Sequence, residues 1–373
     1  MKLAIISHTE HYTLADGTLV GLSSTVNELN NLQAEFETIY HIAMLHHGTA
    51  PANTMAYNSK QIIFIPIPKV GGKRFKDKWQ IITKAPETIR IITKVLNDAD
   101  YFQFRAPIGI GVYLIPYLIL FIKTKGWFKY AGNWNQNKPP LGYALQRWML
   151  KNQSRKVTIN GVWPNQPKQC LSFENPCLTE DDILKGRQFC SQKVWLNKKS
   201  FCFVGRLEPE KGVPLIIETF KLLSEEEKTH IDTLHFIGDG RHYNRFKNEV
   251  KDLGITVLFH GILSRKDVFD VYKQSHVLLL PSKSEGFPKV IIESMNFGCI
   301  PIVSNVSSIG HYISYGVHGY LMESLTPSAL LKQLQIVLQL HSDDYLRIVK
   351  NQESIIRKFT YSNYHRHLKD KVL

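Results

Sequence analysis

Short apolar runs alternate with segments of helical character along this chain, and the alternation begins twice. An apolar run of four to eight residues bounded by turn residues is typical of a buried strand. The first half predicts strands at 3–7, 38–43, 62–66, 101–104, 129–130 and 157–159 and helices at 19–35, 78–97 and 140–152. After a polar connector near 180–198, the second half predicts strands at 200–204, 233–237 and 256–259 and helices near 241–253 and 265–274. Strands that alternate with helices predict parallel sheets covered on both faces.

Length and composition favour two domains. A chain of 373 residues is long for a single core. Hydrophobic residues at 43% and charged residues at 21% are typical of a soluble globular protein. The start, 1–8, predicts a first strand, because its apolar core is too short for a secretory signal. Five cysteines without a Cys-x-x-Cys pair favour reduced thiols in a cytoplasm.

A strand-to-helix turn in the second half carries one carboxylate and is followed by another. The apolar run 277–280 predicts a buried strand, and Pro288 suits the first position of a helix. Glu285 lies on the loop between them, and Glu293 lies inside the helix. The free N–H groups and the positive dipole end of such a helix attract a phosphate. Glu293 lies beyond that phosphate site, where a carboxylate suits neutral hydroxyls such as a ribose diol.

Another strand-to-helix turn carries two cations. The strand expected at 200–204 leads into a loop with Arg206 and Lys211, and a helix is expected to follow. Arginine offers a planar fork of donors and lysine a point charge, and both suit phosphate oxygens. Two fixed cations and a helix N-terminus can hold a diphosphate without a metal. The alternative is a surface loop whose own carboxylates, Glu208 and Glu210, pair with the cations.

The order of several short motifs resembles a known enzyme family. The motifs are Phe203-Val204-Gly205-Arg206 with Lys211-Gly212, Phe236-Ile237-Gly238-Asp239-Gly240, His260-Gly261, the Glu285…Glu293 pair, and the stretches 298–303 and 316–321. In this order they resemble the retaining glycosyltransferases of family 4. That family has the GT-B fold, an α/β architecture of two Rossmann-like βαβ domains that face each other across a cleft. The resemblance is strong over residues 200–325. The Glu-Gly-Phe-Pro form and the stretch 173–180 resemble bacterial members that build surface polysaccharides.

The resemblance implies a domain plan and a reaction. It implies an acceptor-side domain over 1–185, a nucleotide-sugar-binding domain over 186–355, and a C-terminal helix over 356–373 that packs back on the N-terminal domain. The implied reaction is retaining transfer of a sugar from a nucleotide diphosphate sugar to a hydroxyl acceptor. The acceptor would be a lipid-linked or growing glycan of a capsule, exopolysaccharide or O-antigen. No metal and no other cofactor are expected.

The resemblance also assigns roles to the two turns. Arg206 and Lys211 would bind the diphosphate and stabilise the leaving group, and Glu285 would bind hydroxyls of the donor sugar. These three are the expected catalytic residues, and Glu293 would bind the ribose. Backbone N–H groups expected to face the sugar or the phosphates belong to Gly286, Phe287, Lys289 and Val290. In the family the departing phosphate oxygen is thought to deprotonate the acceptor. A double displacement with Glu285 as the nucleophile stays open.

Several positions depart from the family pattern. Proline stands at 288, where glycine is usual, and it removes one backbone donor. Asp16-Gly17 stands where many members have a glycine-rich first loop, and Arg105 stands in the stretch that usually holds a histidine near the donor. We expect Asp16, Gly17 and Arg105 on the acceptor or donor-sugar side. For Arg105, an ion pair in the core or between domains is the alternative.

The positive charge is concentrated in the first half. Residues 60–156 hold 18 Lys and Arg against 4 Asp and Glu, and this difference of 14 equals the net charge of the whole chain. Such a stretch attracts anionic partners. The absence of nucleic-acid-binding motifs argues against nucleic acid. Residues 108–122 are almost wholly apolar but shorter than the ~20 residues that a spanning helix needs. They predict either peripheral attachment to an anionic membrane, on the inner face of the plasma membrane, or a buried helix with a basic end.

Two other functions are compatible with these features. A sugar-nucleotide epimerase of the GT-B fold would release the nucleotide without a glycan acceptor. A non-catalytic module would bind a nucleotide sugar or an anionic surface, although the full set of Arg206, Lys211, Glu285 and Glu293 argues against it. A metal site is not predicted, because the histidines lack metal-ligand spacing with one another.

Overall fold

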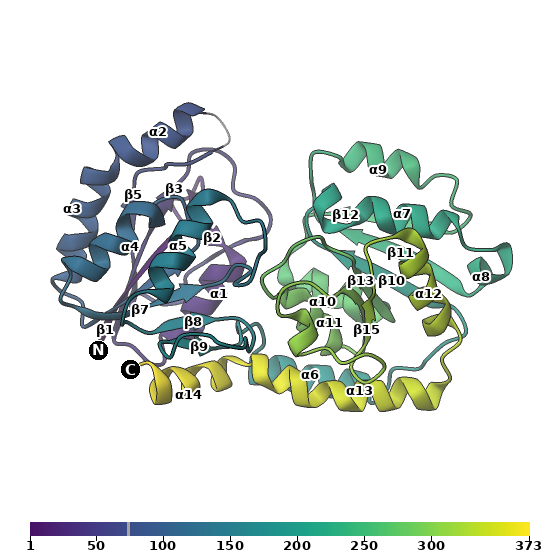
Figure 1. Ribbon diagram of the computed structural model, residues 1–373. Helices are drawn as coiled ribbons and strands as arrows, with labels where there is room; N and C mark the ends of the chain where they lie inside the picture. The colour runs from purple at the N-terminus through teal and green to yellow at the C-terminus, as the bar shows by residue number, and fades with distance from the viewer. Residues whose placement is uncertain (73–74) are drawn as a thin grey trace. The chain divides into compact units, whose positions relative to one another are not determined.

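The computed structural model describes residues 1–72 and 75–373. Figure 1 shows its elements, which divide into two compact units. Unit 1 comprises Met1–Glu174 and Tyr364–Leu373, and unit 2 comprises Asn175–Asn363. The boundary expected between 185 and 186 falls inside helix α6 (Glu180–Cys190), which packs on unit 2. A Cβ on Gly186 would lie 2.3 Å from the Asn296 carbonyl oxygen. Helix α6 is therefore in direct contact with the backbone of unit 2.

Unit 1 is built on a sheet that has nine strands in the described part of the chain. Seven strands run parallel in the order β5-β3-β1-β6-β7-β8-β9, and β2 and β4 are added antiparallel beside the far end of β1. The sheet of unit 1 is therefore mixed, not purely parallel as expected. Its strands are β1 (Lys2–Thr13), β2 (Leu19–Leu22), β3 (Thr38–Leu45), β4 (Thr54–Ala56), β5 (Ile62–Ile67), β6 (Tyr101–Ala106), β7 (Lys125–Tyr130), β8 (Val157–Ile159) and β9 (Cys170–Ser172).

Two helix predictions in unit 1 need correction. The helix expected at 19–35 begins only at Ser23, because Leu19–Leu22 form strand β2, which pairs with the end of β1; the helix is α1 (Ser23–Leu32). The helix expected at 78–97 is two helices, α2 (Phe75–Thr83) and α3 (Ala85–Leu96). Pro86 stands in the first turn of α3, where a missing N–H breaks no intrahelical bond.

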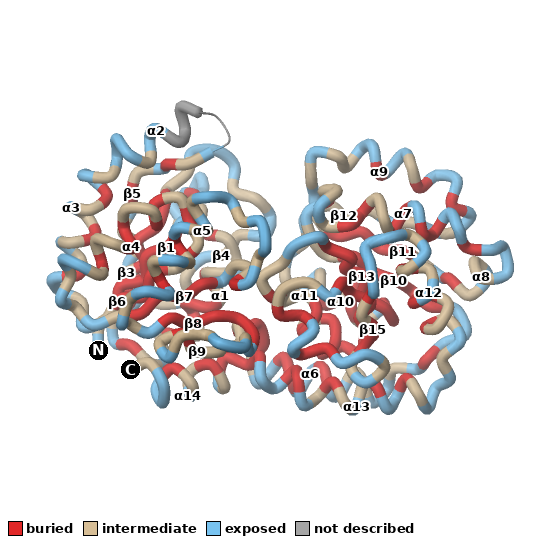
Figure 2. Tube along the Cα trace, in the orientation of Figure 1, coloured by how far each residue is buried: buried red, intermediate tan, exposed pale blue. Residues whose placement is uncertain are grey.

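Helices cover both faces of this sheet. Alternate residues of β1 point to opposite faces, because the side-chain period of a strand is two. Ala4 and Ile6 are buried with side chains of α3, α4 (Gly111–Leu120) and α5 (Leu141–Lys151). Leu3 and Ile5 are buried with side chains of α1 and of the C-terminal helix α14 (Tyr361–Lys371). Figure 2 shows that the buried residues lie mainly in the strands.

The apolar stretch 108–122 is mainly a core element. It contains α4, whose Leu114, Ile115 and Leu118 are fully buried in the core cluster of unit 1. Only its end is open, where Leu120 and Phe121 are exposed. The structure thus favours the buried helix for most of this stretch. Within the described residues, no helix combines the length and the apolar character that crossing a bilayer would require.

Unit 2 contains a six-stranded sheet, parallel throughout, in the order β12-β11-β10-β13-β14-β15. Its strands are β10 (Lys199–Val204), β11 (Ile231–Ile237), β12 (Thr256–Gly261), β13 (Val277–Leu280), β14 (Ile300–Ser304) and β15 (Tyr320–Met322). Its helices include α6, α7 (Val213–Lys221), α8 (Glu225–Thr229), α9 (Tyr243–Glu249), α10 (Arg265–Gln274), α11 (Lys289–Met295), α12 (Pro327–Leu338) and α13 (Ser342–Ile356). The turns that follow β10, β11 and β13 therefore lie at the carboxyl ends of neighbouring strands.

The polar connector expected near 180–198 contains helix α6. Thr179 accepts a hydrogen bond from the Asp182 backbone N–H, and the Asp182 side chain accepts one from the Thr179 N–H. This capping box and the three acids of the first turn stabilise the start of the helix. The Thr-Glu-Asp-Asp sequence carries this signal, which the polar composition of the segment concealed.

Candidate functional site

The cation turn of unit 2 lies between β10 and α7. Arg206 is exposed, and no described residue forms an ion pair with its guanidinium. Glu208 pairs instead with Arg241, at 3.5 Å, and with His242, at 3.8 Å. The alternative in which Glu208 neutralises the cations of its own loop is therefore wrong.

The carboxylate turn lies between β13 and α11 and contacts the cation turn directly. The Lys211 ammonium donates a hydrogen bond to Glu285 Oε1 at 2.6 Å, and both side chains are partly accessible. The backbone N–H of Lys283 donates to the Glu210 carbonyl at 2.9 Å. Two turns more than 70 residues apart in sequence are thus joined by an ion pair and by a backbone hydrogen bond.

Glycines permit this close approach. Gly212, at the end of the cation turn, has a φ of +83° and faces Pro281. A Cβ at this position would lie 2.2 Å from the Pro281 carbonyl oxygen. Gly238, in the turn after β11, has a φ of +127°, and a Cβ there would lie 1.9 Å from the Gly205 oxygen. Only glycine fits both the backbone conformation and the space at these two positions.

The Phe287 side chain anchors the carboxylate turn. Its ring is buried and stacks on Phe359 at a centroid distance of 4.6 Å. The ring also meets the edge of Tyr312 at 4.9 Å. On the same turn, the Gly286 carbonyl accepts a hydrogen bond from the Ser308 hydroxyl at 3.3 Å. These contacts fix the backbone around Glu285.

Helix α11 starts one residue later than expected. Pro288 is its N-cap residue with an extended backbone, and Lys289 is the first helical residue. The Pro288 carbonyl accepts the N–H of Ile291 at 3.2 Å. Lys289 and Val290 stand in the first turn, where the helix itself offers no carbonyl to their N–H groups. Their predicted contact with phosphate stays a prediction.

Glu293 lies on α11 in a cationic environment and is partly accessible. Burial raises the pKa of its carboxyl, and the nearby Arg265 and Lys289 oppose this effect. Arg265 itself is occupied, because its two terminal nitrogens donate to Asp182 at 2.8 and 3.3 Å. Within the described residues, no direct hydrogen bond reaches the Glu293 carboxylate. Its acceptor oxygens remain available to a hydroxyl.

Arg105 belongs to a buried ion cluster of unit 1. Glu28 Oε1 accepts from Arg105 at 2.9 Å and from Lys129 at 2.5 Å. Arg105 also donates from Nε to Gln103 at 2.9 Å. Glu28 and Lys129 are buried, and the Arg105 side chain is only 13% exposed. The structure therefore favours the core ion pair for Arg105.

Asp16 and Gly17 lie at the tip of a β-hairpin. The hairpin joins β1 to β2, and both residues are exposed. The Thr18 N–H donates to Asp16 Oδ1 at 2.9 Å, and Gly17 has a φ of +82°. The hydrogen bonds from Thr18 lower the pKa of Asp16. This turn joins two strands and not the strand and the helix predicted at 3–7 and 19–35, and a role at the acceptor side stays a prediction.

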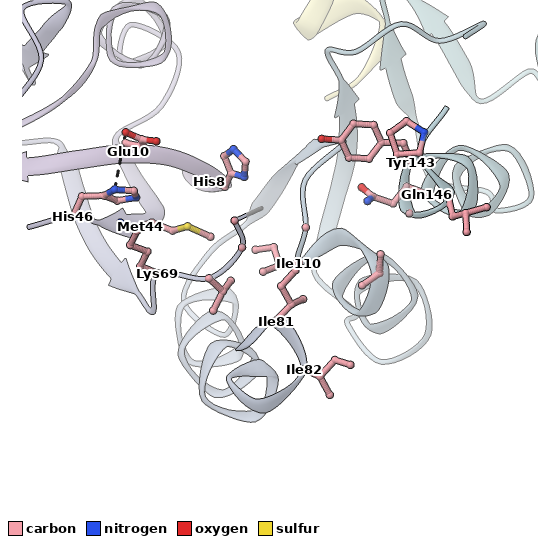
Figure 3. A pocket seen from close by; sticks show the side chains of 18 residues that line it. His8, Glu10, Met44, His46, Lys69, Ile81, Ile82, Ile110, Tyr143 and Gln146 are labelled. Atoms are coloured by element: carbon pink, nitrogen blue, oxygen red, sulfur yellow. Dashed lines mark ion pairs between the residues drawn. The ribbon is translucent and has the colours of Figure 1, made fainter. Parts of the chain in front are cut away.

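Unit 1 contains a cavity of about 1140 Å³ at the carboxyl ends of its parallel strands. Its wall comes from β1, from the segments that follow β3 and β5, and from α2, α4 and α5. The polar lining includes His8, Glu10, His46, Lys69 and Gln146, and the apolar lining includes Met44, Val70, Ile81, Ile82, Ile110, Val112 and Leu141. Figure 3 shows Glu10 and His46 together on one side of the cavity, Tyr143 and Gln146 on the opposite side, and Ile81 and Ile82 below them.

The polar end holds a carboxylate and an imidazole in contact. His46 Nδ1 lies 4.0 Å from Glu10 Oε2, which also accepts a hydrogen bond from the Tyr12 hydroxyl at 2.6 Å. Burial lowers the pKa of His46, although Glu10 opposes this. The imidazole is therefore mainly neutral near pH 7. Lys69 is exposed beside this pair and lacks an ion-pair partner among the described residues.

Sequence reasoning missed this cavity. The sequence alone assigns no role to Glu10, His46 or Lys69. The signal was weak, since the residues come from distant segments. His46 and Lys69 do follow strands of the parallel sheet, and Glu10 lies near the end of β1. That position alone marks candidates, because ligands of such sheets bind at the carboxyl ends of the strands.

Comparisons with known proteins agree with this architecture. Residues 188–354 match the family model "Glycosyl transferases group 1". An uncharacterized glycosyltransferase of Haemophilus influenzae is 30% identical over 277 residues, which are 70% of this chain and 72% of that protein. The Campylobacter jejuni GalNAc-alpha-(1->4)-GalNAc-alpha-(1->3)-diNAcBac-PP-undecaprenol alpha-1,4-N-acetyl-D-galactosaminyltransferase is 29% identical over 204 residues, which are 53% of this chain and 52% of that protein. The structure of Anabaena Alr3699/HepE in complex with UDP-glucose has a TM-score of 0.70 at 13% identity and covers 99% of this chain and 98% of that one.

The fold is that of the GT-B glycosyltransferases, with two α/β units whose sheets are parallel except for β2 and β4 of unit 1. The chain belongs to the group 1 glycosyltransferases. The predicted fold class and the predicted glycosyltransferase activity are thus confirmed. The finer assignments to family 4, to retention and to a particular substrate stay predictions.

Proposed function

We propose that this chain is a retaining, metal-independent glycosyltransferase of family 4. It moves a sugar from a nucleotide diphosphate sugar to a hydroxyl of a lipid-linked glycan during capsule, exopolysaccharide or lipopolysaccharide synthesis. The reaction takes place in the cytoplasm, at the inner face of the plasma membrane. The Campylobacter relative is named for an undecaprenyl diphosphate acceptor, and the Anabaena structure holds UDP-glucose. Both names support this choice of substrates.

One observation carries the proposal: the Lys211–Glu285 pair at 2.6 Å, with Arg206 exposed on the same turn as Lys211. In a nucleotide sugar, an anionic diphosphate is bonded directly to a neutral sugar. A cation beside a carboxylate matches this order, because the cation suits the diphosphate and the carboxylate suits the hydroxyls of the sugar. The diphosphate would take Lys211 from Glu285, and the freed carboxylate would accept hydrogen bonds from the sugar.

The chemistry then follows from charge. Negative charge develops on the diphosphate as the anomeric bond breaks, and Arg206 and Lys211 would stabilise it in place. Glu285 would hold the donor sugar, and Glu293 the ribose. The departing phosphate oxygen would take the proton of the acceptor hydroxyl on the same face of the sugar. A double displacement would instead use Glu285 as the nucleophile.

Nucleotide binding and product analysis test the proposal. UDP, GDP and their sugars would be screened by thermal shift, because a ligand of the folded state raises the unfolding temperature with its concentration. A radiolabelled form of the best donor would then be offered with membrane lipid extracts. We expect label in a longer lipid-linked glycan and, by NMR, the anomeric configuration of the donor. Inverted product would contradict retention, and an altered free sugar would support the epimerase.

A chelator tests metal independence. Full transfer activity is expected in excess EDTA, because fixed cations take the place of a metal in the proposed mechanism. Loss of activity that Mg²⁺ or Mn²⁺ restores would contradict this part of the proposal.

A further inference from the structure

The segment that follows β14, residues 305–309, contains a strained serine, and we call this segment the β14 turn. Ser307 has a φ of +53°, in the left-handed region that residues with a side chain rarely adopt. The next residue, Ser308, has a φ of −89° and a ψ of 7°, and the Ile309 N–H donates to the Val306 carbonyl at 3.2 Å. A positive φ followed by these angles fits a type II′ turn, whose first central position favours glycine. Serine therefore stands where glycine would be less strained.

The β14 turn and the end of β14 are joined to the carboxylate turn at two points. The Ser308 hydroxyl donates to the Gly286 carbonyl at 3.3 Å, and the Ser304 hydroxyl donates to the Ser282 carbonyl at 2.6 Å. Strand β13 lies between β10 and β14 in the sheet. The carboxylate turn therefore has the cation turn on one side and the β14 turn on the other.

The surroundings of Ser307 hold its backbone but leave its side chain free. Ser308 and Ile309 are fully buried, whereas Ser307 is partly accessible. Within the described residues, no hydrogen-bond partner reaches the hydroxyl or the backbone N–H of Ser307. Backbone strain persists only where the surrounding structure enforces it, and it is concentrated at ligand sites. An unpaired hydroxyl on a strained residue beside Glu285 is thus a candidate ligand contact.

A second residue shows what an ordinary case is like. Asn165 has a φ of +58°, and no other described residue apart from Ser307 and the glycines has a positive φ. Asparagine adopts the left-handed region more readily than most residues, because its short polar side chain can hydrogen-bond locally. Asn165 is also exposed on a loop. Its conformation needs no further explanation, whereas that of Ser307 does.

We propose that the Ser307 hydroxyl binds a hydroxyl of the donor sugar, beside Glu285. This inference rests on the proposed function, because it concerns the donor of the same reaction. An ionised carboxylate only accepts hydrogen bonds, whereas a serine hydroxyl both donates and accepts. Ser307 can therefore pair with a sugar hydroxyl that Glu285 does not hold. It is thereby a determinant of which donor sugar is bound.

Isothermal titration calorimetry with the full-length protein tests the proposal. The probes are UDP with UDP-glucose and GDP with GDP-mannose, because the members of each pair differ by the sugar. Ser307→Gly and Ser307→Ala both remove the hydroxyl. Each should weaken binding of the preferred nucleotide sugar by about two- to tenfold, the range for one neutral hydrogen bond. Binding of the nucleotide alone should be unchanged.

Thermal unfolding separates loss of the hydroxyl from damage to the turn. Ser307→Gly relieves the positive φ and should raise the unfolding temperature by up to about 4 °C, since the freer unfolded chain offsets part of the gain. Ser307→Ala keeps the positive φ and should unfold close to the wild type. Weaker binding of the nucleotide sugar by a more stable protein cannot result from a damaged fold.

A matched control and three outcomes make the test decisive. Ser342→Ala changes an exposed serine at the start of α13 and should leave all binding unchanged. Wild-type affinity for the nucleotide sugar in both Ser307 variants would overturn the proposal. Equal weakening of nucleotide and nucleotide sugar would also overturn it, because the effect would then not depend on the sugar. A Ser307→Gly protein less stable than the wild type would remove the strain on which the inference depends.

Product analysis separates this inference from the proposed function. If the Ser307 variants bind the nucleotide sugar more weakly but the wild type makes no glycan, the proposed function is contradicted and the assignment of Ser307 stands. If both Ser307 variants transfer sugar at the wild-type rate with limiting donor, only the assignment of Ser307 is contradicted.

Discussion

The two units use charged residues in opposite ways. Unit 2 keeps Arg206 exposed and Lys211 and Glu285 partly accessible on turns at the edge of its sheet. Unit 1 buries Glu28 of α1 together with Lys129 of β7, and it exposes the apolar Leu141, Leu145 and Trp148 on α5. The same residue types thus stand on accessible turns in one unit and in the core of the other. The charge of a residue alone does not identify it as functional. Its burial and its ion-pair partners must also be known.

The largest expected effect tests the structural role of the buried cluster. Glu28→Gln would leave Arg105 and Lys129 without their counter-charge, and breaking a buried pair costs about 3–5 kcal/mol. Urea unfolding measures this loss. Glu87→Gln is the control, since its pair with Lys84 is half exposed and such pairs contribute about 0–1 kcal/mol. Equal, small losses in both variants would remove the contrast between the two units.

Arg206→Ala tests the opposite role in unit 2. The transfer rate should fall by about 10²–10³, which is the cost of losing one fixed charge at a developing anion. The free energy of unfolding should hardly change, because the side chain is exposed and unpaired among the described residues. Arg241→Ala, which loses a 3.5 Å pair between an exposed arginine and Glu208, should keep most of the activity. A destabilised Arg206→Ala protein would show that this arginine supports the fold.

Gly212→Ala tests whether close approach of the two turns forms the donor site. Both Gly212 and the control Gly316 have positive φ, but a Cβ on Gly316 meets nothing within 4 Å. Gly316→Ala should therefore cost only the left-handed strain of about 1–2 kcal/mol. Gly212→Ala adds the clash with Pro281, about 1–3 kcal/mol more. It should also weaken the thermal shift given by UDP. Equal stability and equal UDP thermal shifts for the two alanine variants would show that close contact between the two turns is not needed for the donor site.

Acid should weaken both units, and His276 supplies the smallest test. Burial lowers the pKa of His276 in unit 2 and of His11 in unit 1 to about 4, from 6.5. The unfolded chain then binds more protons, so this stability is complete above pH 6.5 and is lost as pH falls towards 4. His276 Nδ1 accepts the Ser200 N–H at 3.1 Å, so the imidazole is neutral. His276→Asn keeps an acceptor and should reduce the loss of stability between pH 6.5 and 4. An unchanged profile in urea unfolding would contradict this.

The elements of unit 2 that the sequence predicted lie close to their expected bounds, because they are specified locally. Helix α10 has the predicted bounds, and Ser264 caps it by accepting the Asp267 N–H. The two turns could also be found, since their glycines, prolines and charges stand in short continuous segments. Strand β2 could not be found, because its pairing with β1 is decided by the tertiary structure. Local apolar residues permit both states there.

The unit 1 cavity was beyond sequence reasoning for a similar cause. Glu10 lies opposite Met44 in the β1–β3 register, after an irregularity between Ile6 and Glu10. That shift brings Glu10 near His46. An irregular strand register cannot be predicted from the periodicity of the sequence. The ion pair of Arg105 could not be predicted from the sequence either, because its partner Glu28 lies 77 residues away on another element.

The placement of α14 has a consequence for biosynthesis. Tyr364 and Leu368, near the end of the chain, are buried with Leu3 and Ile5, near its beginning. The ribosome therefore releases nearly all of unit 1 long before the residues that seal one of its apolar faces exist. Unit 2 is made in full during that wait. The apolar face formed by Leu3 and Ile5 is therefore completed only by residues that are synthesised after unit 2.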